Sequence, residues 1–264
     1  MVDIHCHIIP GVDDGAQNDA EALEMLKNAS LNGITSVVAT PHHMSGDFRN
    51  EPERVLAEVA RLDALASAEG IGVRVLPGQE VRVYSGMGRD YESGSLIGIA
   101  GSAYVLIEFS FALLAGSVDY IIADLMSAGA KPVLAHPERY PYFKDDPSKL
   151  FELVDDGVLM QVTAGSIAGV FGRRAQELCF RMIEQGAVHV VASDAHNSGG
   201  RSFNMSEAYA LIEGRYGIGY ADWLKGNAQK IIDGKLITPF EGVISARRLP
   251  KRKIGLFGIF CKKQ

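Results

Sequence analysis

Cysteine is scarce in this chain of 264 residues, which has only Cys6, Cys179 and Cys261. The three lie far apart, so they form neither the close pairs of a zinc-binding module nor an evident disulfide framework. This scarcity excludes a small secreted domain stabilised by disulfide bonds. It is typical of proteins in a reducing compartment, and we expect a cytoplasmic location.

Long apolar runs are missing as well. No segment approaches the roughly 18 apolar residues that a membrane-spanning helix needs. The N-terminus has no basic stretch followed by an apolar one, so we expect no signal peptide. With 47% hydrophobic and 22% charged residues, the composition is that of a globular protein whose length suffices for a full core.

Positive charge is sparse except at the carboxyl end. The formal net charge is −6, and the segment from residue 246 onward has seven basic residues and no acidic one, so the remainder carries −13. This acidic body argues against a nucleic-acid partner. The segment 241–264 mixes basic with large apolar residues, a composition that suits peripheral contact with an anionic membrane, the alternative being a disordered terminus. We therefore divide the chain into a domain at 1–240 and a basic-hydrophobic tail at 241–264.

The domain alternates short apolar strands with amphipathic helices. We expect helices at 18–31, 51–69, 117–128, 147–156, 173–185, 205–216 and 221–232, and a tight loop at 164–166. The strands are about seven, short and rich in β-branched residues, as buried parallel strands are. No linker divides the pattern. It predicts a single α/β domain, a closed or nearly closed β/α barrel, with a doubly wound open sheet as the alternative.

Histidines and carboxylates follow the expected strands. His5 and His7 are two residues apart, so their imidazoles project from one face of a strand, and Asp13 and Asp14 come one turn later. Taken alone, the H-x-H pattern is equally compatible with incidental histidines. In β/α barrels, however, the carboxyl ends of the strands assemble the site. The residues that we expect to meet there are His5, His7, Asp14, His42, Glu80, Glu108, His136, Asp194 and His196.

Glu108 is the strongest evidence that the nine residues form a site, because it lies within the apolar stretch YVLIEF. A carboxylate buried among aliphatic side chains must be paired or bound to a metal. The nine candidate ligands offer only oxygen and imidazole nitrogen and are too many for one zinc ion. They suit two or three ions such as Mn²⁺, Fe or Zn²⁺ that share bridging carboxylates.

Six motifs, in this order and spacing, resemble the PHP (polymerase and histidinol phosphatase) superfamily. The resemblance is strongest to its bacterial CpsB/CapC-type branch, the metal-dependent protein-tyrosine phosphatases of capsule and exopolysaccharide synthesis. Many other PHP proteins have histidine where this chain has Glu108, and glutamate there points to that branch. The similarity extends from residue 1 to about 235. The motifs are DIHCH followed by Asp14, TPHH, GQE, IEF, HPER and SDAH.

The resemblance implies a distorted (β/α)7 barrel, a single-domain α/β fold with metals at the carboxyl ends of the strands. Manganese is the expected metal, with two or three ions per site and Fe or Zn²⁺ as alternatives. The first ion would be held by His5, His7, Glu80 and Asp194, the second by Glu80, Glu108 and His136, and the third by Asp14, His42 and His196. Asp13 and Asp14 could exchange roles.

Hydrolysis of a phosphate monoester requires neutralisation of the phosphoryl charge and an in-line nucleophile, and clustered metals supply both through a bridging hydroxide. Arg139 and Arg201 are the candidate phosphate ligands, because guanidinium matches phosphate geometry. Arg139 directly follows the motif at His136, whereas Arg201, in a glycine-rich loop, could equally be a solvated arginine. No cysteine stands in a C-x5-R pattern, and the chain has no R-H-G, so thiolate and phosphohistidine routes are excluded.

The expected substrate is phosphotyrosine on a protein, which the resemblance identifies as a membrane-associated bacterial tyrosine kinase. A small phosphomonoester such as histidinol phosphate is the alternative substrate. A PHP fold without activity that serves as a binding module is the third hypothesis. His43 and His189 are outside the expected ligand set; we expect His43 to support a neighbouring ligand or to pack in the core, and His189 to pack in the core.

Overall fold

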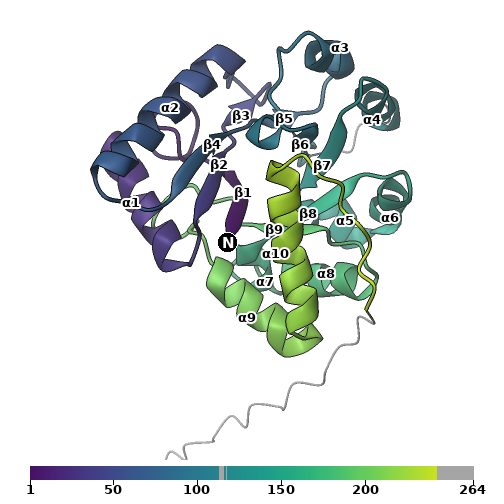
Figure 1. Ribbon diagram of the computed structural model, residues 1–264. Helices are drawn as coiled ribbons and strands as arrows, with labels where there is room; N and C mark the ends of the chain where they lie inside the picture. Colours follow the sequence, from purple (N-terminus) through teal and green to yellow (C-terminus); the bar gives the residue numbers. More distant parts are fainter. Residues whose placement is uncertain (113–115, 117, 243–264) are drawn as a thin grey trace, which may run out of the picture.

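The strands pair in parallel and alternate with helices along the sequence, as Figure 1 shows. The computed structural model describes residues 1–112, 116 and 118–242. The strands in this part of the chain are β1 (Val2–Cys6), β2 (Ser36–Ala39), β3 (His42–His43), β4 (Arg74–Pro77), β5 (Glu80–Arg82), β6 (Tyr104–Glu108), β7 (Lys131–Ala135), β8 (Leu159–Thr163) and β9 (Val190–Ala192). The predicted α/β fold with parallel strands is confirmed.

Helices surround the strands (Figure 1). The first begins where the Asn18 side chain accepts a hydrogen bond from the Glu21 N–H, and the second begins with Pro52, a residue suited to a first helical position. The helices are α1 (Asp19–Leu31), α2 (Pro52–Ala68), α3 (Met87–Glu92), α4 (Val118–Ser127), α5 (Pro141–Asp145), α6 (Ser148–Asp155), α7 (Ala164–Ile167), α8 (Arg173–Glu184), α9 (Met205–Tyr216) and α10 (Ile218–Ile232), with 3-10 turns η1 (Ile99–Gly101) and η2 (Pro137–Arg139).

The strands form two sheets, β1-β2-β4 and β3-β5-β6-β7-β8-β9. The chain passes from the first sheet to the second between β2 and β3 and again between β4 and β5. At the other edge, the His7 N–H donates to the Ala195 carbonyl at 2.9 Å and the Asp194 N–H donates to the His5 carbonyl at 2.9 Å. The end of β1 therefore contacts the segment after β9. The strand ladders of the described residues do not join into one closed ring.

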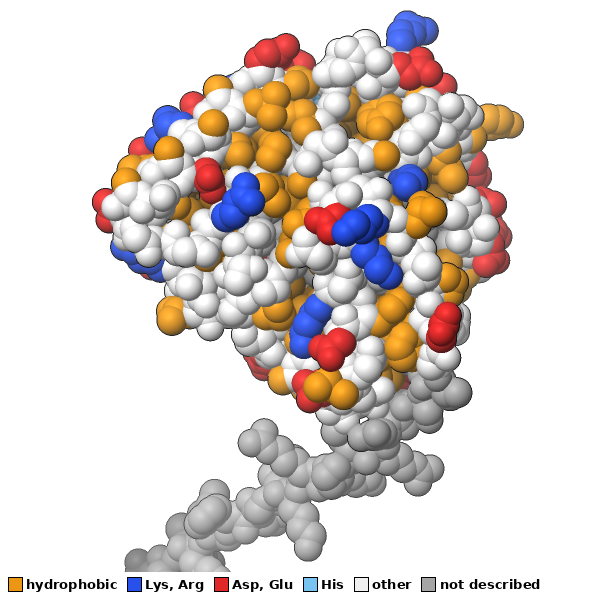
Figure 2. Space-filling model, viewed as in Figure 1, with side chains coloured by type: hydrophobic (Ala, Val, Ile, Leu, Met, Phe, Trp, Pro, Cys, Tyr) orange, Lys and Arg blue, Asp and Glu red, His pale blue; other side chains and the backbone are white. Residues whose placement is uncertain are grey.

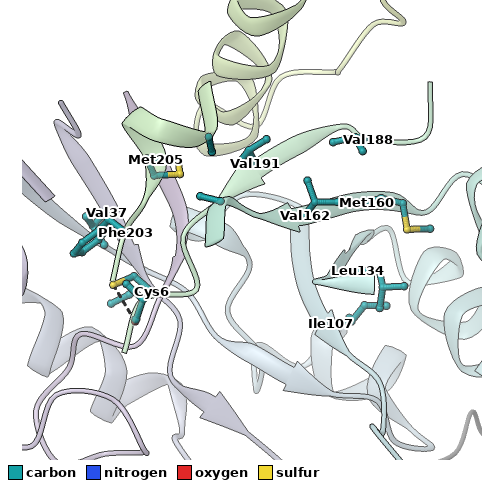
Figure 3. Packing of buried hydrophobic residues seen from close by; sticks show 14 of the residues in the cluster. Cys6, Val37, Ile107, Leu134, Met160, Val162, Val188, Val191, Phe203 and Met205 are labelled. Atoms are coloured by element: carbon teal, nitrogen blue, oxygen red, sulfur yellow. Dashed lines mark hydrogen bonds between the residues drawn. The ribbon is translucent and has the colours of Figure 1, made fainter. Parts of the chain in front are cut away.

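The described buried apolar residues form two clusters, and Figure 3 shows part of the larger one, in which Val162 and Val191 of the strands lie in the same cluster as Met205 of α9. Every residue of β1 and of β6 is buried. Cys6 is fully buried in this cluster, and its thiol donates to the Ala195 carbonyl at 3.5 Å. Burial raises the pKa of the Cys6 and Cys179 thiols well above the ordinary value, so neither is a ready nucleophile. The expectation that Cys6 is a core residue is confirmed.

One expectation about local structure differs from the observed fold. The predicted loop at 164–166 is wrong, because residues Ala164–Ile167 form the short helix α7. Its first turn is capped by the Thr163 side chain, which accepts from the Ser166 N–H at 3.3 Å. Of the basic-hydrophobic tail predicted at 241–264, residues 243–264 lie outside the described residues. Within the part of the chain that is described, no helix is long and apolar enough to cross a membrane.

The surface in Figure 2 shows Lys and Arg interspersed with Asp and Glu and with apolar side chains. On this face the basic side chains do not form one continuous surface.

His189 joins β8 to the start of β9. Its N–H donates to the Met160 carbonyl at 3.0 Å, and its Nδ1 accepts from the Met160 N–H at 3.0 Å. The Asn227 side chain donates to the His189 carbonyl at 2.9 Å. Burial lowers the pKa of His189 from 6.5 to about 4. The imidazole therefore has a structural position, as expected, and is neutral in the folded protein near pH 7.

We predict that His189 makes the protein acid-sensitive. Between pH 6.5 and 4 the unfolded chain binds a proton at this imidazole that the folded chain does not. The contribution of the neutral imidazole to the free energy of unfolding is therefore fully present above pH 6.5 and is lost as the pH falls toward 4. The loss amounts to something on the order of 3 kcal/mol. Denaturant unfolding across this range should show a steeper fall for wild type than for His189→Gln. Parallel pH profiles would contradict the prediction.

Candidate metal centre

All nine candidate ligands come together at the carboxyl ends of the strands. His5 is in β1, His42 begins β3, Glu80 begins β5 and Glu108 ends β6. The remaining five lie in the segments that follow strands, namely His7, Asp14, His136, Asp194 and His196. Strand register sets part of this arrangement, because His42 pairs with Glu80 across neighbouring parallel strands. Most of these side chains are buried, whereas 49% of the Asp14 side chain and 13% of the His42 side chain are exposed.

Possible ligand atoms gather in three groups, in each of which they lie within 4.8 Å of one another. The groups are His5, His7 and Glu80; His42, Glu80 and Glu108; and His7, Asp14, His42 and His196. Glu80 belongs to two of them, as a bridging carboxylate would.

Two further candidates border these groups. Asp194 Oδ1 lies 3.3 Å from His5 Nε2, and His136 Nε2 lies 2.8 Å from Glu80 Oε1. His136 Nε2 is also 3.9 Å from Glu108 Oε1. The structure thus brings His42 as well as His136 to the pair of carboxylates at Glu80 and Glu108.

The donor set fits divalent metals. Among the candidate ligands, five buried atoms make no hydrogen bond to any described residue: His42 Nδ1, Glu80 Oε2, Glu108 Oε2, His136 Nδ1 and His196 Nε2. Of these, Glu108 Oε2 is ion-paired with the Arg82 guanidinium at 2.8 Å. His42 Nδ1 and Glu80 Oε2 are only 2.9 Å apart, yet their orientation is not that of a hydrogen bond. Buried polar atoms without partners are costly, and a metal bond would satisfy them. Imidazole nitrogen and carboxylate oxygen are donors that Mn²⁺, Fe and Zn²⁺ all accept.

Electrostatics differ among the carboxylates. Burial raises the pKa of Glu80, but the imidazoles of His5 and His42 outweigh it, so the pKa lies well below the usual range. The pKa of Asp194 is likewise held low against burial, by His5 and by Arg139 among others. For Glu108, burial and then repulsion from Glu80 raise the pKa to about 7. The centre thus concentrates negative charge around Glu80 and Asp194, where cations would be attracted.

Hydrogen bonds orient the imidazoles toward the centre. His5 Nδ1 lies 2.8 Å from Gln161 Oε1, and His7 Nδ1 lies 2.7 Å from Asp13 Oδ2. An oxygen of this kind accepts, so each Nδ1 donates and each Nε2 keeps its lone pair for the centre. His196 Nδ1 donates in the same way to the Asp194 carbonyl at 3.0 Å. Partners of this type fix the tautomer and ring orientation of metal ligands.

The two neighbouring aspartates have different positions. Besides His7, Asp13 accepts from the N–H groups of Gly15 at 2.9 Å and His42 at 3.1 Å. Asp14 Oδ1 instead lies 3.3 Å from His196 Nε2 and 3.5 Å from His42 Nε2. Asp14 therefore joins a ligand group, while Asp13 orients His7. Only glycine fits at residue 15, because a Cβ there would lie 2.0 Å from the His7 carbonyl oxygen.

Two candidate ligands have left-handed backbone conformations, His136 with φ 37° and Asp194 with φ 53°. Residues other than glycine rarely adopt them, and the surroundings must impose them. For Asp194, buried Asp3 supplies the restraint by accepting from the Ser193 N–H at 2.9 Å and the Ser193 hydroxyl at 2.5 Å.

Both predicted arginines reach the centre. Arg139 donates to Asp194, and its guanidinium carbon lies 4.6 Å from the centre of the Phe171 ring. Arg201 donates to Asp194 Oδ2 at 3.1 Å and lies 3.5 Å from Asp14 Oδ2. Arg201 thus contacts two candidate ligands, and its role as a phosphate ligand stays a prediction.

Arg82 is a residue that sequence reasoning missed. It donates to Ser45 Oγ at 3.0 Å, and its guanidinium lies 2.8 Å from Glu108 Oε2. This ion pair already compensates the buried charge of Glu108, so burial of Glu108 does not by itself require a metal. Arg82 is two residues after Glu80, the spacing that places both on one strand face, and this was a usable signal. His43 is buried and outside the three groups, as expected of a packing residue.

Comparison with known sequences identifies the family of this chain. The sequence profile of the family described as "Capsular polysaccharide synthesis, CpsB/CapC" matches residues 1–233. This chain belongs to the CpsB/CapC family. It is 37% identical over 260 residues to tyrosine-protein phosphatase YwqE of Bacillus subtilis (strain 168), spanning 98% of this chain and 100% of YwqE. It is 29% identical over 243 residues to tyrosine-protein phosphatase CpsB of Streptococcus pneumoniae, spanning 90% of this chain and 100% of that protein.

A comparison with solved structures also matches this CpsB/CapC member to proteins of its family. Crystal structures described as those of YwqE from Bacillus subtilis and CpsB from Streptococcus pneumoniae, metal-dependent tyrosine phosphatases, include a chain that matches with a TM-score of 0.88 at 36% identity. The match covers 94% of this chain and 100% of the other. The resemblance inferred from the six motifs is thereby confirmed.

Proposed function

We propose that this chain is a metal-dependent protein-tyrosine phosphatase that hydrolyses phosphotyrosine. The observation that carries the proposal is that seven candidate ligands form three groups, that Asp194 and His136 border them, and that two arginines donate to Asp194. Membership of the CpsB/CapC family, with relatives named tyrosine-protein phosphatases over their full length, supports it.

The centre would hold two or three metal ions, with manganese as our proposal and Fe or Zn²⁺ as alternatives. In the proposed arrangement, Glu80 would be a ligand shared by two of the groups, and the two sheets would act together as a distorted (β/α)7 barrel. The proposed ligands are His5, His7, Asp14, His42, Glu80, Glu108, His136, Asp194 and His196. When bound, such ions neutralise phosphoryl charge and make water nucleophilic at neutral pH.

The protein's own groups would orient the substrate. Arg139 and Arg201 approach Asp194 from the carboxyl end of the strands, and they can offer planar donors to the phosphoryl oxygens. Gln161 and Asp13 keep the lone pairs of His5 and His7 directed at the centre. The proposed roles are thus substrate orientation for the arginines and ligand orientation for Gln161 and Asp13.

The proposed protein substrate is a membrane-associated bacterial tyrosine kinase that controls capsule or exopolysaccharide synthesis. The phosphatase would act at the inner face of the membrane and contact it through its basic-hydrophobic tail. Pelleting with anionic liposomes, compared between the full chain and a chain ending at Gly242, tests the membrane contact; equal pelleting would count against it.

The assay that tests the function compares phosphate release from a phosphotyrosine peptide and from histidinol phosphate. We expect faster phosphate release from the peptide in Mn²⁺ and loss of release in EDTA, because the ions would supply the nucleophile. We also expect inhibition by vanadate, because vanadate resembles the transition state of phosphoryl transfer. Preference for histidinol phosphate would assign a small-molecule substrate to the same site. Absence of metal-dependent release from both would contradict the proposal.

A further inference from the structure

Phe111 is an exposed aromatic residue beside the candidate metal centre. Three residues beyond the end of β6, it retains 37% of its surface open to solvent. Its ring lies 5.6 Å from the His136 imidazole, with the two planes 25° apart. A large apolar side chain left open next to charged and polar groups offers a contact surface to a ligand.

Packing holds this ring in place. The Phe111 ring lies 4.8 Å from the ring of Tyr140, which is fully buried and accepts a hydrogen bond from the Phe109 N–H at 2.9 Å. Tyr142 stacks on Tyr140 at 5.3 Å with the planes 4° apart, and its hydroxyl donates to the Ser110 carbonyl at 3.0 Å. The two residues that precede Phe111 are therefore tied to a stacked pair of tyrosines. A ring held in this way loses little conformational freedom when a ligand binds.

Arg139, a candidate phosphate ligand, lies beside the Phe111 ring. Its guanidinium carbon lies 5.7 Å from the centre of the Phe111 ring and 4.6 Å from that of Phe171. In an aryl phosphate a single oxygen joins the phosphorus to the ring. A phosphoryl group bound at Arg139 therefore brings its aryl ring within reach of Phe111, whereas an alkyl phosphate presents no ring there.

We propose that Phe111 is a specificity-determining residue that packs against the aryl ring of the substrate and selects aryl over alkyl phosphates. This inference rests on the proposed function in one respect, that the phosphoryl group binds beside Arg139. The preference comes from burial of apolar area and from ring-to-ring contact, neither of which a serine or threonine phosphate can provide.

The test measures binding rather than turnover. Calorimetry with the Mn²⁺-loaded protein compares phenylphosphonate with methylphosphonate, two stable analogues that differ in the ring. We expect wild type to bind the phenyl compound about tenfold more tightly, and Phe111→Ala to remove most of this preference while changing methylphosphonate affinity less than about twofold. Phe111→Leu, which retains apolar bulk without a ring, should fall between them. Tyr120→Ala is the matched control, because Tyr120 is 81% exposed on α4.

Metal content and thermal unfolding of each variant establish that the centre and the fold are retained. The inference is overturned if wild type shows no preference for the phenyl compound, or if Phe111→Ala weakens both phosphonates by the same factor. The proposed function fails separately: a protein that prefers phenylphosphonate through Phe111 but releases no phosphate from a phosphotyrosine peptide would keep the aryl site and lose the phosphatase assignment.

Discussion

Glu80→Gln is expected to reduce metal-dependent phosphate release by about 1,000-fold or more and to weaken metal binding by at least about 100-fold. Glu80 is fully buried, and its oxygens lie 2.8 Å from His136 Nε2 and 2.9 Å from His42 Nδ1. The carboxylate belongs to two of the three ligand groups, so one substitution removes a negative ligand from both. Glutamine preserves shape but directs an N–H₂ group toward nitrogens or metals, where it cannot serve as a ligand.

The measurement is metal content after dialysis, with turnover of a phosphotyrosine peptide in saturating Mn²⁺. Glu24→Gln is the matched control, since Glu24 is exposed on α1 and outside the centre. Both variants should unfold at temperatures near that of wild type in EDTA. Full metal content in Glu80→Gln would remove Glu80 from the ligand set.

Arg139→Lys is expected to lower kcat/KM for a phosphotyrosine peptide by about 100-fold while leaving metal content unchanged. Lysine preserves the positive charge but lacks the planar guanidinium that can contact two phosphoryl oxygens at once. It also loses the contacts of the guanidinium with the rings of Phe111 and Phe171. The loss should therefore come from orientation of the substrate rather than from net charge.

Steady-state kinetics and metal analysis of the same preparation separate these effects. Arg174→Lys serves as the control, because Arg174 is 68% exposed and pairs with Asp145 on the surface. Wild-type kinetics in Arg139→Lys would show that a positive charge alone suffices. Loss of metal would instead assign Arg139 a part in holding Asp194, to which it donates.

The two arginines illustrate how far sequence reasoning extends at this site. Arg139 was predictable because it directly follows the motif at His136. The role of Arg201 could not be decided from the sequence, because its distance from Asp194 depends on the conformation of the glycine-rich loop, which local spacing does not specify. Likewise Glu108 was singled out correctly as a special carboxylate, but its partner Arg82 lies on the neighbouring strand and is set by strand register.

By itself, the sequence determined the α/β class, the parallel strands and the nine candidate ligands, because hydrophobic period and the residues at strand ends are local properties. Only the tertiary structure decided that Asp14 joins a ligand group while Asp13 orients His7, that Gln161 orients His5, and that Phe111 stands beside Arg139. These distances join side chains that are far apart in the sequence, or, for Asp13 and Asp14, neighbouring side chains of one loop that point to different partners. Close packing and strand register set such distances, and no periodicity in the sequence encodes them.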